Sequence, residues 1–211
     1  MRGGVPMLLR HPVWFRFLRF RCRGGKRREA YNRALEVLPM GYVLGQQTCP
    51  DFRVGAAHMN RVGCEIAAVY NALRLCGQEL PCAEIIRVFE EEGYLMGALT
   101  VGDLGADPYA IGEFFTGAGV AYTRYADFDT MCTAADGSRG CGGVFIASFW
   151  NRRRIWGGLH TVAFCSCRTD RLLHVFNFHG NDPGILMAEH FSALTDKKRF
   201  ITGYKVGLYP A

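Results

Sequence analysis

Apolar residues in the first half of the chain recur at helical spacing. The clearest case lies between Asn60 and Gly77, where apolar side chains fall three or four residues apart, at Ile66, Val69, Tyr70 and Leu73. Gly63 precedes this run and Gly77 ends it, so both ends of the helix are marked. Similar spacing predicts helices over Lys26–Val37, from Pro81 onward with Glu90–Glu92 at the exposed end, and from Asp107 to about Thr116.

After Gly119 the period shortens to that of strands. Apolar segments of strand length occur at Val120–Tyr125, Val144–Trp150, Leu159–Cys167, Leu172–His179 and Phe200–Leu208. Arg168–Arg171 is short enough to make the third and fourth segments a hairpin. Short helices are predicted at Asp127–Ala135 and Met187–Leu194. Helices followed by antiparallel strands predict an α+β fold, with the N-terminal helices packed on a C-terminal sheet.

Residues 1–38 are predicted to form a basic extension, and residues 39–211 the main domain. A helix over Trp14–Arg23 in the extension gathers three arginines on one face, within about 60° of one another. Such a helix fits an anionic membrane surface or a partner protein. The alternative is a helix that packs its aromatic side chains on the main domain and leaves its arginines in solvent. Nucleic-acid binding is not expected, because the basic stripe is short and no nucleic-acid-binding module accompanies it.

Composition and charge support this division. The chain has 211 residues, of which 49% are hydrophobic and 21% charged, as is typical of a globular domain. Residues 1–33 carry ten Lys/Arg and one acidic residue, whereas the remainder carries fifteen Lys/Arg and eighteen acidic residues. Nine cysteines without regular spacing favour reduced thiols and a cytoplasmic location, with peripheral membrane attachment as a further option. No apolar run approaches the roughly 20 residues of a transmembrane helix.

Cys64 stands on the first turn of the Asn60–Gly77 helix. Unpaired N–H groups and the helix dipole favour an anion there, which predicts a lowered thiol pKa and a nucleophilic thiolate. The competing interpretation is a small buried hydrophobic residue. A nucleophilic cysteine needs a base with an orienting partner. His160 starts one strand of the predicted hairpin and Asn177 lies near the end of the other, so Asn177 can accept the His160 N–H if both share a face.

The chain resembles papain-like cysteine peptidases in the order of three residues. A cysteine on a helix comes first, a histidine on a strand follows, and an asparagine lies on the next strand. The chain is most similar to the bacterial branch of double-glycine-leader (bacteriocin-processing) peptidases, through Gly63-Cys64-Glu65 at the head of the helix and Asn71 near its end. H-T-V-A-F at His160 and V-F-N-F around Asn177 match as well. The resemblance covers roughly residues 42–180. Asn71 is expected to bridge within the fold rather than to act on a substrate.

The resemblance implies a papain-like fold and acyl transfer. A Cys64 thiolate paired with a His160 imidazolium would attack an amide carbonyl of a peptide or peptide-like substrate, with Asn177 orienting the histidine. The thioester would then be hydrolysed, and no cofactor is expected. An upstream glutamine would complete the oxyanion hole beside the Cys64 N–H, and either Gln46 or Gln47 fits.

The loop from Trp150 to Trp156 directly precedes the histidine strand and should overhang the site. Its candidate substrate-binding residues are Trp150, Arg153 and Trp156, of which the arginine suits a carboxylate. The alternative is an ordinary exposed hairpin loop. Two other functions stay open, namely a catalytically inactive domain that binds peptides or leader sequences, and an acyltransferase that uses the same thioester.

Two cysteines raise the question of a metal site. Cys165 and Cys167 form a C-x-C on one face of a predicted strand. No second such pair exists at the spacing of a zinc site, so the sequence predicts no metal.

Overall fold

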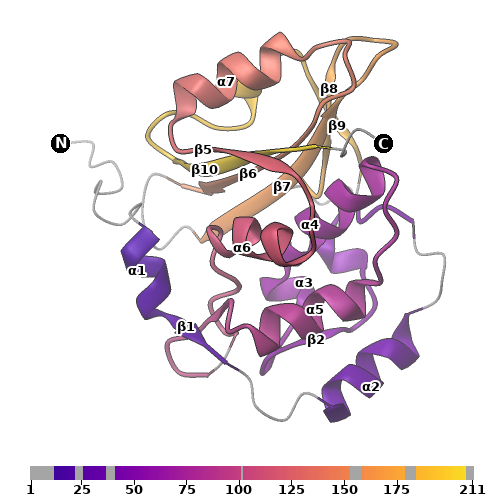
Figure 1. The fold of residues 1–211 in the computed structure, drawn as a ribbon, viewed down its shortest axis with the longest axis vertical. Coiled ribbons are helices and arrows are strands. Elements are labelled where there is room, and N and C mark those ends of the chain that lie inside the picture. Colours follow the sequence, from indigo (N-terminus) through magenta and orange to yellow (C-terminus); the bar gives the residue numbers. More distant parts are fainter. Residues whose placement is uncertain are drawn as a thin grey trace.

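The computed structural model describes residues 12–21, 26–36, 41–100, 102–152, 158–178 and 184–207. Helices dominate the first part of these residues, and a six-stranded antiparallel sheet dominates the second. The predicted α+β fold class is therefore confirmed. Figure 1 shows the sheet with helix α7 (Phe128–Gly137) on one side and the earlier helices on the other.

The helical layer is organised around one buried helix. The helices of this layer are α2 (Lys26–Leu35), α3 (Met59–Val62), α4 (Cys64–Leu75), α5 (Cys82–Glu91) and α6 (Ala110–Gly117). Helix α4 lies at its centre, and every residue from Cys64 to Leu73 is buried. Gly63 separates α3 from α4, and this position requires glycine because a Cβ there would lie 2.8 Å from the Met59 carbonyl oxygen. The predicted helix is confirmed, with a break just before Cys64.

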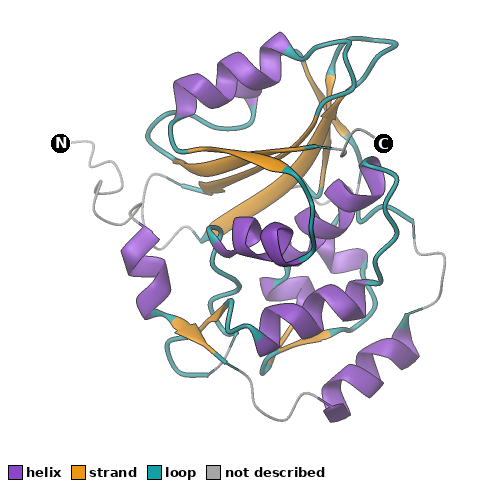
Figure 2. Cartoon of the chain, in the orientation of Figure 1, coloured by secondary structure: helices purple, strands orange, loops and turns teal. Residues whose placement is uncertain are grey.

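The sheet has the strand order β5-β10-β6-β7-β8-β9, and all neighbours are antiparallel. Figure 2 shows its strands in orange, between helices drawn in purple. Its strands are β5 (Tyr122–Tyr125), β6 (Val144–Trp150), β7 (Leu159–Ser166), β8 (Leu173–Phe176), β9 (Leu186–Ala188) and β10 (Phe200–Val206). Strands β7 and β8 form the predicted hairpin. The order places β7 in the middle of the sheet, next to α4.

The sheet separates two hydrophobic cores. Ala163 and Tyr204 belong to the core shared with α4, whereas Phe164 belongs to the core that includes Met131 of α7. Successive side chains of a strand point to opposite faces of its sheet. Odd-numbered residues of β7 therefore face α4, and even-numbered residues face the core under α7.

Buried asparagines fasten irregular backbone to the helices. Asn71 of α4 donates from its amide to the Val43 carbonyl and accepts from the Val43 N–H, both at 2.8 Å. Asn32 of α2 makes the same paired contact with Arg53. Arg53 lies in a small hairpin of β2 (Arg53–Val54) and β3 (Ala57–His58), which follows a 3₁₀ turn, η2 (Gln46–Thr48). Asn71 thus bridges within the fold, as predicted.

The described part of the N-terminal extension comprises helix α1 (Pro12–Phe17), strand β1 (Arg19–Phe20) and helix α2, which joins the helical layer. The predicted helix over Trp14–Arg23 ends at Phe17 and is wrong at Arg19–Phe20, which form a strand, while residues 22 and 23 lie outside the described residues. Strand β1 pairs with β4 (Leu95–Met96). Its backbone hydrogen bonds therefore go to the main domain, whereas in a longer helix they would be made within the helix.

Side chains of this segment divide between the main domain and solvent. Phe15 is buried, and its ring centroid lies 5.6 Å from that of Tyr109. Trp14, Phe17 and Phe20 are exposed. Docking of these exposed aromatic residues on a membrane or partner stays a prediction. Within the described residues, no helix has the length and apolar character needed to cross a bilayer.

Three other details differ from the sequence prediction. The helix expected at Met187–Leu194 is wrong, because Leu186–Ala188 pairs with β8 and only a 3₁₀ turn, η4 (Phe191–Ala193), follows. Glu90 is buried rather than exposed, since it accepts the Gly55 N–H and an Arg28 N–H. Helix α6 begins at Ala110, after a turn in which Asp107 accepts the Tyr109 N–H.

Candidate functional site

A cavity of about 500 Å³ lies at the N-terminal end of α4. This volume falls in the usual range of small-molecule sites. Much of its lining is apolar, from Phe15, Leu18, Val62, Met96, Leu104 and Trp150. The polar lining includes Cys64, Glu65, Arg61 and Asp103. The predicted nucleophile therefore borders a pocket large enough to hold part of a substrate.

The Cys64 thiol lies between a carboxylate and a strand. Its Sγ donates to Glu65 Oε2 at 3.3 Å and lies 3.9 Å from the Leu159 carbonyl oxygen. Burial and then the Glu65 charge raise the pKa of Cys64 well above its usual value, although the N–H groups of Thr161 and Glu65 lower it. The predicted lowering of this pKa is wrong, because desolvation outweighs the helix N-terminus.

Glu65 is a buried carboxylate of the cavity. Its Oε1 accepts from the Thr161 hydroxyl at 3.1 Å, and its Oε2 accepts from the Ala106 N–H at 3.4 Å. The Thr161 hydroxyl in turn lies 2.9 Å from that of Ser148. Burial raises the pKa of Glu65 from 4.5 to about 7. At neutral pH this carboxyl can therefore both donate and accept a proton.

His160 and Asn177 are neighbours, but through the backbone. His160 Nε2 lies 2.7 Å from the carbonyl oxygen of Asn177, not from its side chain as predicted. A carbonyl oxygen only accepts, so Nε2 carries the proton and Nδ1 is the basic nitrogen in the neutral ring. The tautomer of His160 is thus fixed by the backbone of Asn177 rather than by its side chain.

The pleat of β7 separates two consecutive side chains. Thr161 reaches Glu65 on α4, whereas the His160 ring contacts Phe149 of the core under α7, at 5.9 Å between ring centroids. Cys64 Sγ approaches the strand at the backbone of Leu159, the residue before His160. The structure therefore brings His160 and Asn177 together, whereas the His160 ring and Cys64 lie on opposite faces of the sheet at the same end of β7.

The two candidate glutamines differ in their surroundings. Gln46 donates its backbone N–H to Asn177 Oδ1 at 2.7 Å, and its Oε1 lies 3.4 Å from Asn177 Nδ2. Gln47 is exposed. The Asn177 side chain therefore fixes the Gln46 turn, and Gln46 is the glutamine connected to the histidine. Trp150 lines the cavity, whereas Arg153 and Trp156 lie outside the described residues.

Replacing Asn177 separates its backbone role from its side-chain role. Asn177 has φ 58°, which glycine adopts freely but alanine does not. Asn177→Gly should keep the Nε2–H tautomer of His160, and Asn177→Ala should be less stable than Asn177→Gly by about 1 kcal/mol. Nitrogen-15 NMR of the imidazole and urea unfolding measure these effects. Loss of the tautomer in Asn177→Gly would show that the side chain holds the ring.

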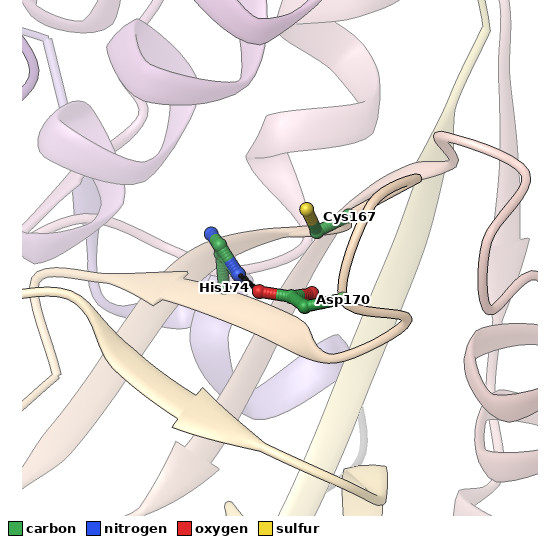
Figure 3. Close-up of side chains that lie close together, drawn as sticks. All are labelled: Cys167, Asp170 and His174. Carbon is green, nitrogen blue, oxygen red and sulfur yellow. Dashed lines mark hydrogen bonds and ion pairs between the residues drawn. The ribbon is translucent and has the colours of Figure 1, made fainter.

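A second group of reactive side chains lies at the turn between β7 and β8, where Cys167, Asp170 and His174 converge (Figure 3). Sequence spacing between cysteines missed this group because Asp170 and His174 join it through the hairpin. The signal that could have found it was the hairpin itself, which places His174 opposite Cys165.

Comparison with known proteins gives no match to a family model, to a curated protein or to a solved structure.

Proposed function

We propose that the protein is a papain-like cysteine hydrolase that cleaves a peptide or amide bond through a thioester on Cys64. The observation that carries this proposal is the cavity at the head of α4, which is lined by Cys64 and closed on one side by the start of the His160 strand. A nucleophile at a helix N-terminus, beside a pocket, supports acyl transfer, and the tautomer-fixed His160 follows Leu159, whose carbonyl oxygen lies 3.9 Å from Cys64 Sγ.

The raised pKa of Cys64 determines how the reaction would begin. The thiol is protonated at rest, so a preformed ion pair is not the starting state. His160 would take the Cys64 proton on Nδ1 as Sγ attacks the carbonyl carbon. Because the His160 ring lies on the face of the sheet opposite α4, this step requires the start of β7 to rearrange so that Nδ1 reaches the thiol. The imidazolium would then protonate the leaving amine, and a water molecule would cleave the thioester and restore the thiol.

Hydrogen-bond donors at the cavity suit the carbonyl group of a substrate, and its apolar lining suits an apolar substituent. The Trp150 indole Nε1 is buried and has no hydrogen-bond partner within the described residues, so its N–H is a donor available to a bound ligand. The Cys64 N–H would be one donor to the oxyanion, and the Gln46 side chain would be the second if its Nε2 left the Asn60 carbonyl oxygen, to which it donates at 3.1 Å. The apolar lining fits a hydrophobic side chain or acyl group next to the scissile bond.

An acyl-ester panel tests this proposal without a known substrate. We expect p-nitrophenyl esters of medium-length fatty acids to give a burst of nitrophenolate and a thioester on Cys64 that intact-mass spectrometry detects. Cys64→Ala should abolish the thioester, and His160→Gln should slow acylation by at least about 100-fold. Cys141→Ser removes an exposed thiol and should change neither. Equal acylation of wild type and Cys64→Ala would refute the proposal.

The same panel separates the two other functions. A catalytically inactive domain that binds peptides or leader sequences is favoured by the burial of Cys64 and its raised pKa. That function predicts binding of a hydrophobic peptide with no thioester at any pH between 6 and 9. An acyltransferase predicts the thioester together with its faster loss when an amine such as glycinamide is added.

A further inference from the structure

The Cys167, Asp170 and His174 group is independent of the Cys64 cavity. Their donor atoms all lie within 4.8 Å of one another, and the three residues span the turn that joins β7 to β8 (Figure 3). Asp170 Oδ2 lies 2.6 Å from His174 Nε2. Cys167 Sγ lies 3.1 Å from the Thr169 hydroxyl, on the same turn.

The backbone holds these side chains in place. Asp170 Oδ1 accepts the Leu172 N–H at 2.9 Å, which fixes the carboxylate within the turn. His174 stands on β8 opposite Cys165 of β7, so the strand pairing fixes its Cα. Two of the three side chains are thus positioned by the hairpin itself, and reorganisation on binding an ion would be small.

An ordinary His–Asp pair explains only part of this arrangement. Another His–Asp pair among the described residues, His58 with Asp51, has no cysteine thiol close enough to form a three-ligand group with it. At the hairpin, a thiol joins the imidazole and carboxylate, and these are the three ligand types that zinc prefers. Tetrahedral zinc sites with bond lengths of about 2.0 to 2.3 Å have ligand atoms roughly 3.3 to 3.8 Å apart, which small side-chain rotations would reach here.

We propose that Cys167, Asp170 and His174 bind a zinc ion, with water in the fourth position. His174 and Asp170 are partly exposed, with 23% and 37% of their side chains accessible, so an ion can enter from solvent. The ion binds Nε2 of neutral His174, whose ring proton then sits on Nδ1, and Cys167 binds as thiolate with release of its proton to solvent. The site fastens the β7–β8 turn, at the far end of β7 from His160.

Zinc titration of the full chain tests the site. The reduced, chelator-treated protein should bind one equivalent of Zn²⁺ in competition with a chromophoric chelator, and Co²⁺ in its place should give a thiolate-to-cobalt charge-transfer band. Cys167→Ser and His174→Asn should each weaken Zn²⁺ binding by more than about 100-fold. His58→Asn and Cys132→Ser are matched controls outside the group and should bind as wild type does.

A second measurement uses the wild-type chain alone, so it does not depend on a variant that folds. Zn²⁺ should protect Cys167 from iodoacetamide, as read by peptide mass spectrometry, and leave labelling of Cys141 unchanged. Unchanged Zn²⁺ affinity in Cys167→Ser and His174→Asn, or equal labelling of Cys167 with and without Zn²⁺, would overturn the site. Neither result bears on the Cys64 reaction.

Discussion

Replacing Arg19 by Met should lower the free energy of unfolding by about 3 to 5 kcal/mol. Arg19 joins the N-terminal segment to two acidic residues of the main domain. Its Nε donates to Asp107 Oδ2 at 2.6 Å, and its terminal nitrogens donate to both oxygens of Glu113 at 2.8 and 2.9 Å. The Asp107 side chain is fully buried, so the variant leaves a buried charge without its cation. Urea unfolding at pH 7 measures the loss.

A matched control lies one turn away. Arg16 also contacts Glu113, but at 3.4 Å and with 67% of its side chain exposed, so Arg16→Met should cost no more than about 1 kcal/mol. The Arg19→Met loss should also shrink at low pH, because burial already raises the pKa of Asp107 and protonation removes the unpaired charge. Equal losses in the two variants would mean that Asp107 is solvated in the folded protein.

Glu65 should make the fold less stable as pH rises. Its pKa is about 7 in the folded protein and 4.5 when unperturbed, so the folded state holds a proton that the unfolded state has lost between these values. The contribution of neutral Glu65 to the free energy of unfolding is complete below about pH 4.5. It is lost as the pH rises to about 7, and the total loss is about 3 kcal/mol. Chemical unfolding of wild type against Glu65→Gln, at half-unit intervals from pH 5 to 8, isolates this contribution.

Glu65→Gln should remove that part of the pH dependence. The amide keeps an acceptor for the Ala106 N–H and a partner for Thr161, but cannot ionise. Removing the charge also lowers the pKa of Cys64, so the variant thiol should react faster with iodoacetamide at pH 8 than the wild-type thiol. Parallel stability curves for wild type and Glu65→Gln would show that Glu65 is ionised throughout this range.

Helix and strand positions followed from the sequence wherever one side of an element is buried. The Asn60–Gly77 pattern predicted α4 because its apolar positions repeat at the helical period. Val144–Trp150 was predicted with its observed bounds, since a continuous apolar run of strand length belongs in the middle of a sheet. The predictions failed where a distant partner decides the conformation. Leu186–Ala188 became a strand by pairing with the edge of β8.

The candidate site divides in the same way. The sequence by itself predicted that Cys64 would begin a helix and that His160 and Asn177 would meet on a hairpin, because both depend on local periodicity and chain order. Only the tertiary structure decided that the Asn177 backbone carbonyl holds His160, and that burial beside Glu65 raises the pKa of Cys64. The burial of a side chain, the face of the sheet on which it lies and its hydrogen bonds depend on residues far apart in the chain. The pairing of β7 with β8 likewise assembles the Cys167, Asp170 and His174 group, which the cysteine spacing did not predict.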